Sequence, residues 1–97
     1  MSGFTPFSDN HESQIQITKD VLGTLIGRRS AWIHEEEHSV KPDQAKINAW
    51  ENEQGDYMDM QKRLPSMTES EIADLLNTYD AKVKHEADAD SKHQQGG

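Results

Sequence analysis

Two prolines divide the chain into three segments, and each segment carries an apolar stripe with the spacing of an α-helix. Pro42 and Pro65 can stand only in the first turn of a helix or outside one, because proline lacks an amide hydrogen and clashes with the preceding turn. No stretch of useful length alternates with the period of two that a strand requires. The pattern predicts an all-α fold: a helical hairpin plus a third, shorter helix, as a small three-helix bundle with flexible N- and C-terminal tails.

The first helix is predicted over residues 11–38, after a flexible N-terminal lead at residues 1–10. Its large apolar residues fall in one sector of the helix surface, which predicts a buried face. Thr18, Arg29 and Glu36 share this sector, and we expect the long charged side chains to reach outward from its margin. The apolar members of the stripe are Ile15, Val21, Leu22, Leu25, Ile26, Trp32 and Ile33.

Gly23 and Gly27 lie on the side of this helix away from the apolar stripe. Each glycine costs about 1 kcal/mol relative to alanine in a helix interior. Two interpretations stay open. The glycines are merely tolerated, or they form a patch without bulk on which a second helix or a second subunit packs closely.

The second helix is predicted over residues 42–64, with Pro42 at its first position. A heptad seam runs along it, and two of the six seam positions are glutamine. Such a seam is typical of a partner-facing surface, and equally of a poorly packed bundle edge. Gly55 could break the helix in two. The seam residues are Ile47, Trp50, Gln54, Tyr57, Gln61 and Leu64.

The third helix is predicted over residues 68–84 and has the clearest start signal in the chain. Thr68 followed by Glu71 forms a capping box, in which each side chain bonds the backbone amide of the other residue. A narrow apolar stripe follows, and residues 85–97 then offer only alanine as apolar content, which predicts a disordered tail. Residues 11–84 are therefore expected to form a single helical domain. The stripe comprises Ile72, Leu75, Leu76, Tyr79 and Val83.

The chain is poor in the residues that build a core. Leucine, isoleucine, valine and phenylalanine account for 16 of its 97 residues, and the net charge is −8. This share is below the roughly 20% that, combined with high net charge, warns of partial disorder. Either a thin core suffices, or the stripes are buried against a second chain, so a homodimer stays open.

The negative charge is concentrated between Glu35 and Asp59, where eight acidic residues face only Lys41 and Lys46. Such a surface repels nucleic acid and anionic membranes and favours partners with a basic surface. The alternative is that the acidic residues only keep the protein in solution. The run Glu35-Glu36-Glu37 lies near a helix C-terminus, where negative charge is unfavourable, and is a candidate contact point.

The run from His34 to His38 matches the H-E-x-x-H pattern of zinc proteases, in which two histidines on one helical face bind zinc and the glutamate activates water. Here both histidines lie opposite the apolar stripe and should face solvent. The chain also predicts no sheet or cleft for a substrate. We therefore expect no metal site and no cofactor, with His34 and His38 as a weak metal candidate and a zinc-dependent hydrolase as a remote alternative.

Other catalytic patterns are missing from the sequence. The chain has no cysteine, no nucleophile motif and no glycine-rich phosphate loop. The N-terminus lacks the features of a cleavable signal peptide, and no apolar run approaches the about 18 residues that span a bilayer. The expectation is a cytoplasmic protein that is not an enzyme and binds no membrane, with export by a route without a cleavable signal left open.

These features favour a non-enzymatic protein-binding module that neutralises, inhibits or chaperones a partner protein, in the manner of an inhibitor, an antitoxin or a secretion chaperone. A narrower version is nucleic-acid mimicry, in which the acidic surface occupies a basic cleft. The alternative is a self-assembling structural subunit built from helical hairpins. The residues predicted to bind the partner are Glu35, Glu36, Glu37, Asp43, Trp50, Glu51, Glu53, Gln54, Tyr57, Asp59 and Gln61.

Overall fold

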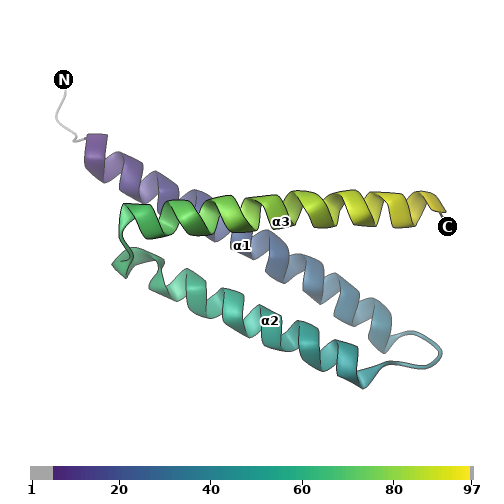
Figure 1. Cartoon of the computed structure of the whole chain (residues 1–97). Helices are drawn as coiled ribbons and strands as arrows, with labels where there is room; N and C mark the ends of the chain where they lie inside the picture. The colour runs from purple at the N-terminus through teal and green to yellow at the C-terminus, as the bar shows by residue number, and fades with distance from the viewer. Residues whose placement is uncertain (1–5, 97) are drawn as a thin grey trace.

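Helices account for nearly all of the chain in the computed structural model, which describes the backbone of residues 6–96 and the side chains of residues 11–89 (Figure 1). No strand occurs in this part of the chain, so the all-α prediction is confirmed. The third helix was expected to be the shortest, but the second helix is shorter. The elements are α1 (Pro6–Glu37), α2 (Gln44–Arg63), a single turn of 3-10 helix η1 (Leu64–Ser66) and α3 (Glu69–Gly96).

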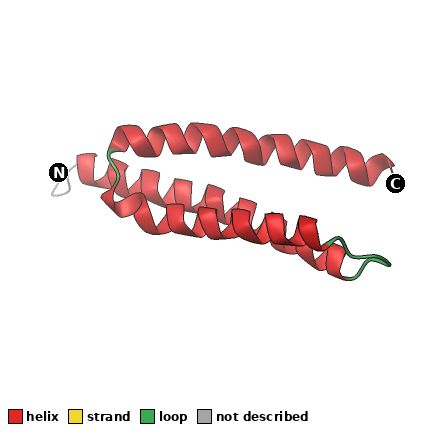
Figure 2. Cartoon of the chain, turned by 60° about the horizontal axis from the view of Figure 1, so that its bottom comes forward, coloured by secondary structure: helices red, strands yellow, loops and turns green. Residues whose placement is uncertain are grey.

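α1 and α2 form an antiparallel hairpin. α3 then runs alongside α1, in the same direction as α1 and opposite to α2 (Figures 1 and 2). α3 packs mainly against α1 and diverges from α2 toward its C-terminal end (Figure 1). The result is elongated, with extents of 60 × 27 × 19 Å. Over the described residues, no helix combines the length and the apolar content needed to cross a membrane.

The core lies where the three helices meet, and it is built from the predicted stripes. The stripes of α1 and α3 are core faces, because Leu22, Leu25 and Ile72 are fully buried. Ile17, which falls outside the α1 stripe, is half exposed. The buried cluster consists of Leu22, Leu25, Tyr57, Leu64 and Ile72.

The turn between α1 and α2 is fixed by an N-cap at Asp43, so the second helix begins two residues later than expected. The carboxylate of Asp43 accepts hydrogen bonds from the backbone amides of Ala45 and Lys46, so α2 begins at Gln44. Pro42 therefore precedes the cap instead of occupying the first helical position, because aspartate satisfies the free amides of a first turn and proline cannot. α2 continues through Gly55 without a break.

The capping box at the start of α3 is confirmed. The Thr68 amide donates to Glu71 Oε1 at 2.9 Å, and the Glu71 amide donates to Thr68 Oγ1 at 3.1 Å. Pro65 lies in η1, where the chain leaves α2 and redirects toward α3.

α3 is longer than predicted, since its backbone stays helical to Gly96. Two ion pairs support the helix around the predicted end at residue 84: Lys84–Asp80 and Lys82–Glu86. The partners of each pair are four positions apart, about one helical turn. Alanine is the best helix former and recurs beyond that point. The rest of the predicted tail, from residue 90 onward, lies outside the described side chains.

α1 also begins earlier than predicted, at Pro6 instead of residue 11. Proline is well suited to the first position of a helix, because its missing amide hydrogen has no partner there in any case. Residues 1–5 of the predicted N-terminal lead lie outside the described part of the chain.

Candidate functional site

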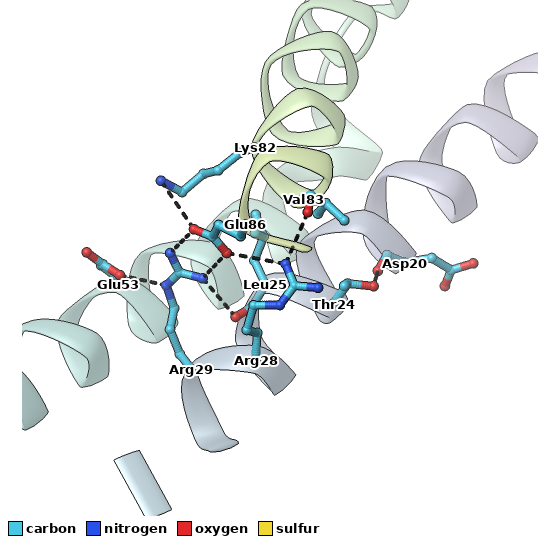
Figure 3. A network of polar contacts seen from close by, with 9 residues as sticks. All are labelled: Asp20, Thr24, Leu25, Arg28, Arg29, Glu53, Lys82, Val83 and Glu86. Atoms are coloured by element: carbon cyan, nitrogen blue, oxygen red, sulfur yellow. Dashed lines mark hydrogen bonds and ion pairs between the residues drawn. The ribbon is translucent and has the colours of Figure 1, made fainter. Parts of the chain in front are cut away.

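A buried arginine connects all three helices (Figure 3). Arg29 of α1 is 2% exposed. Its Nε donates to Glu53 Oε1 of α2 at 2.6 Å. Its Nη1 and Nη2 donate to the two carboxylate oxygens of Glu86 in α3 at 3.0 and 2.6 Å, and Nη1 also donates to the Leu25 carbonyl at 3.2 Å. The expectation that Arg29 reaches outward is therefore wrong, because two carboxylates pair with the guanidinium inside the bundle.

The electrostatics of this cluster favour the charged forms. Burial alone would lower the pKa of Arg29, but the hydrogen bonds to Glu86 and Glu53 outweigh burial and raise it above its usual range. Burial likewise opposes ionisation of Glu86, yet its hydrogen bonds and charge interaction with Arg29 bring the pKa of this carboxyl below its usual value. The cluster is thus an ion-paired joint between helices, in which both partners keep their charge.

Further cations surround Glu86. Arg28 Nη1 lies 3.5 Å from Glu86 Oε1 and also donates to the Val83 carbonyl at 3.1 Å. Lys82 Nζ lies 3.6 Å from Glu86 Oε2. The side chain of Glu86 is only 12% exposed, so this one carboxylate concentrates the polar contacts between α1 and α3 (Figure 3).

Two aromatic rings lie close to the Arg29 guanidinium. The Arg29 Cζ atom lies 4.9 Å from the ring centroid of Trp32 and 5.3 Å from that of Tyr57, within the range of cation–π contacts. The rings of Trp32 and Trp50 pack across the hairpin with their centroids 5.6 Å apart. Tyr57 packs edge to face on Tyr79 of α3, with the two ring centroids 5.7 Å apart. Burial raises the pKa of the Tyr57 phenol.

The two glutamines of the α2 seam bond to the backbone of α1. Gln54 Nε2 donates to the Ile26 carbonyl at 2.9 Å and to Ser30 Oγ at 2.8 Å. Gln61 Nε2 donates to the Lys19 carbonyl at 2.9 Å. The seam therefore faces α1 of the same chain, with its amides acting as hydrogen-bond donors across the hairpin.

The Gly23 side of α1 lies next to this seam. A Cβ atom at Gly23 would stand 3.7 Å from Gln61 Nε2, an ordinary contact distance, and a Cβ at Gly27 would meet nothing within 4 Å. Within the monomer, neither glycine is therefore required for close packing, which fits the interpretation that they are tolerated.

The acidic residues at the turn between α1 and α2 are of two kinds: some hold the turn and others face solvent. Glu36 Oε2 accepts a hydrogen bond from the Asp43 amide at 2.9 Å, and Asp43 in turn caps α2. Glu35 and Glu37 on either side are exposed. The charge run at the end of α1 thus uses one of its three glutamates to close the turn and leaves two facing solvent.

The predicted partner-binding residues consequently separate into two groups. Seven of them make contacts within the chain: Glu36, Asp43, Trp50, Glu53, Gln54, Tyr57 and Gln61. The other four have exposed side chains that make no hydrogen bond or ion pair with the described part of the chain: Glu35, Glu37, Glu51 and Asp59. Partner binding stays a prediction for both groups, and the second group is free to contact another molecule.

His34 in the last turn of α1 and His38 just after its end are both exposed, with ring centroids 4.2 Å apart. The Nδ1 atom of His38 is 2.8 Å from the His34 carbonyl oxygen, so one ring nitrogen already has a backbone partner. Among the described residues, no three histidine, aspartate or glutamate side chains are grouped as a metal ion would need. The H-E-x-x-H match is therefore a pair of solvent-facing imidazoles beside the turn.

Sequence reasoning missed the role of Glu86, which it assigned to the tail. A signal was present, because Glu86 continues the α3 stripe three positions after Val83. A buried-face arginine such as Arg29 also requires a carboxylate partner on a facing helix.

Comparison with known proteins adds no further assignment: no family model, no curated protein and no solved structure matches the chain.

Proposed function

We propose that this chain is a non-enzymatic protein-binding module that presents an acidic helical surface to a basic surface on another protein. The observation that carries the proposal is the division of the acidic residues. Those needed by the fold are paired inside the chain, and Glu35, Glu37, Glu51 and Asp59 remain exposed without partners in the described part. Exposed carboxylates of one sign attract and orient a basic partner.

The internal ion pairs leave this external charge undiminished. The cluster contains three cations, Arg28, Arg29 and Lys82, and two anions, Glu53 and Glu86. It therefore carries a charge of +1, and the remainder of the molecule carries −9. A partner therefore meets a surface on which negative charge predominates. Such a module would inhibit, neutralise or chaperone its partner by covering a basic surface, and in the narrower version it would occupy a nucleic-acid-binding cleft.

The test is capture of partners from the native host with the tagged chain, followed by affinity measurement on the purified partner. We expect the affinity to fall as salt rises, and to fall roughly thirtyfold in Glu35→Lys/Glu37→Lys, because two lost or reversed exposed contacts cost about 2 kcal/mol together. Glu36 and Asp43 are left intact, because they hold the turn. For mimicry, duplex DNA should compete with the chain for the partner.

The matched control is Glu12→Lys/Asp20→Lys, which makes the same charge change at exposed positions of α1 far from the turn. Its affinity should stay close to that of the wild type apart from a general charge effect. If the two double variants lose affinity equally, and binding is insensitive to salt, the acidic surface is not the binding surface and the proposal fails.

A further inference from the structure

A shallow groove of about 380 Å³ runs along the N-terminal half of α3. Its lining residues are Met67, Glu71, Asp74, Leu75, Thr78 and Tyr79. They come from the turn before α3 and from successive turns of the helix itself. The groove lies at the end of the bundle opposite the turn between α1 and α2 (Figure 1). At its edge, Tyr79 contacts Tyr57, whose ring lies against the Arg29 guanidinium.

The groove has an apolar floor and an acidic rim. Met67, Leu75 and Tyr79 are half-buried and pack against the core, so they present fixed apolar surface. Glu71 and Asp74 are exposed at the rim, and no lysine or arginine lines the groove. This combination complements a segment that carries apolar side chains on one face and positive charges beside them.

The shape of the groove favours a protein segment over a small molecule. Sites for small ligands enclose about 70–90% of the ligand surface. Here all the lining residues lie between 67 and 79, on a single helix and the turn before it, so no second element closes the opposite side. A groove of this kind accepts side chains that project from a larger partner, as in recognition of an amphipathic helix.

We propose that this groove binds a cationic amphipathic helix of the partner protein. One or two of its apolar side chains would pack on Leu75 and Tyr79, and its lysine or arginine residues would pair with Asp74 and Glu71. One oxygen of Glu71 accepts the Thr68 amide in the capping box, and the other has no such role. The inference rests on the proposed function, because it names the segment of the basic partner and where it docks.

The experiment titrates the full chain with a synthetic peptide of leucine and lysine arranged with helical period. A control peptide carries glutamate in place of every lysine. Calorimetry gives the affinity, and amide chemical shifts locate the contact. We expect the lysine peptide to bind with shifts centred on residues 67–79, and the glutamate peptide to bind at least about tenfold more weakly, equivalent to about 1.4 kcal/mol.

Three variants make the test specific. Asp74→Lys reverses a rim charge and should lower the affinity for the lysine peptide about tenfold. Asp56→Lys makes the same change at an exposed acid of α2 and should have little effect. Thr78→Trp fills the groove from its exposed rim and should abolish the shifts at residues 67–79. Circular dichroism before each titration establishes that the variants keep their helices.

Equal weakening by Asp74→Lys and Asp56→Lys would overturn the inference, and so would unchanged binding in Thr78→Trp or shifts centred on residues 35–59. Sedimentation showing a dimer that Thr78→Trp dissociates would also overturn it, because the occupant would then be a second copy of the chain. A captured partner that binds the groove variants normally defeats this inference alone. Absence of any salt-sensitive protein partner defeats the proposed function.

Discussion

The guanidinium of Arg29 binds the carboxylate of Glu86 through two hydrogen bonds, 3.0 and 2.6 Å long, across 57 positions of the sequence. This two-point contact joins α1 to α3 at a place where both side chains are almost entirely withdrawn from water. A buried charge is tolerated only when it is paired and hydrogen-bonded. The stability of the bundle should therefore depend on this pair more than on any exposed ion pair.

Glu53 and Glu86 offer a matched comparison, because each lies 2.6 Å from a nitrogen of Arg29. Their side chains differ in exposure, 44% for Glu53 and 12% for Glu86. Glu86→Gln should lower the free energy of unfolding by about 3 kcal/mol, as expected for a broken buried pair. Glu53→Gln should cost less than about 1 kcal/mol. Urea unfolding followed by circular dichroism measures both, and equal losses would show that burial does not set the strength of these pairs.

Glu86 should also make the protein sensitive to acid. Its pKa in the folded chain is lowered from the ordinary value of 4.5, because the hydrogen bonds from Arg29 outweigh the effect of burial. A depressed carboxyl pKa contributes stability above the ordinary value, and this contribution is lost as the pH falls through the folded-state value. The free energy of unfolding should therefore drop as the pH falls below about 4.5, and Glu86→Gln should flatten this dependence. An identical acid slope in the variant would assign the effect to other groups.

The amide of Gln54 should matter as a donor. Gln54→Glu keeps the shape of the side chain but replaces the amide with a carboxylate that cannot donate to the Ile26 carbonyl. We expect a loss of about 1–3 kcal/mol for Gln54→Glu and about 1 kcal/mol for Gln54→Met, which removes the hydrogen bond without adding charge. Thermal unfolding of the two variants measures the difference. If Gln54→Glu is as stable as the wild type, the hydrogen bonds from Gln54 to α1 do not contribute.

Gly27 should be replaceable with a gain in stability. A Cβ atom there meets nothing within 4 Å, so Gly27→Ala should raise the free energy of unfolding by about 1 kcal/mol. Gly23→Ala should gain less, because its Cβ would contact Gln61 Nε2 at 3.7 Å. Sedimentation on the same samples addresses self-assembly. A wild-type oligomer that Gly27→Ala dissociates would mean that another subunit packs on this face.

Local signals determined most of the fold. The stripes of α1 and α3, the capping box of Thr68 and the break at Pro65 each act over a few residues, so sequence patterns are sufficient to locate them. The position of Arg29 was different, because its inward orientation depends on carboxylates of two other helices. The same holds for Gln54 and Gln61, whose amides look like a polar surface until α1 lies opposite. Features that arise from contacts between distant segments are the ones that a single stripe does not reveal.

The length of α3 has its own consequence. Apolar packing on α1 ends with Val83, yet the helix must continue one turn further to place the carboxylate of Glu86 on Arg29. A chain truncated just after Val83 would keep the apolar stripe and lose the anion, leaving the guanidinium with Glu53 alone inside the bundle. The last helix must therefore extend at least to Glu86 to neutralise Arg29, so a charge requirement adds to the apolar packing that joins α1 and α3.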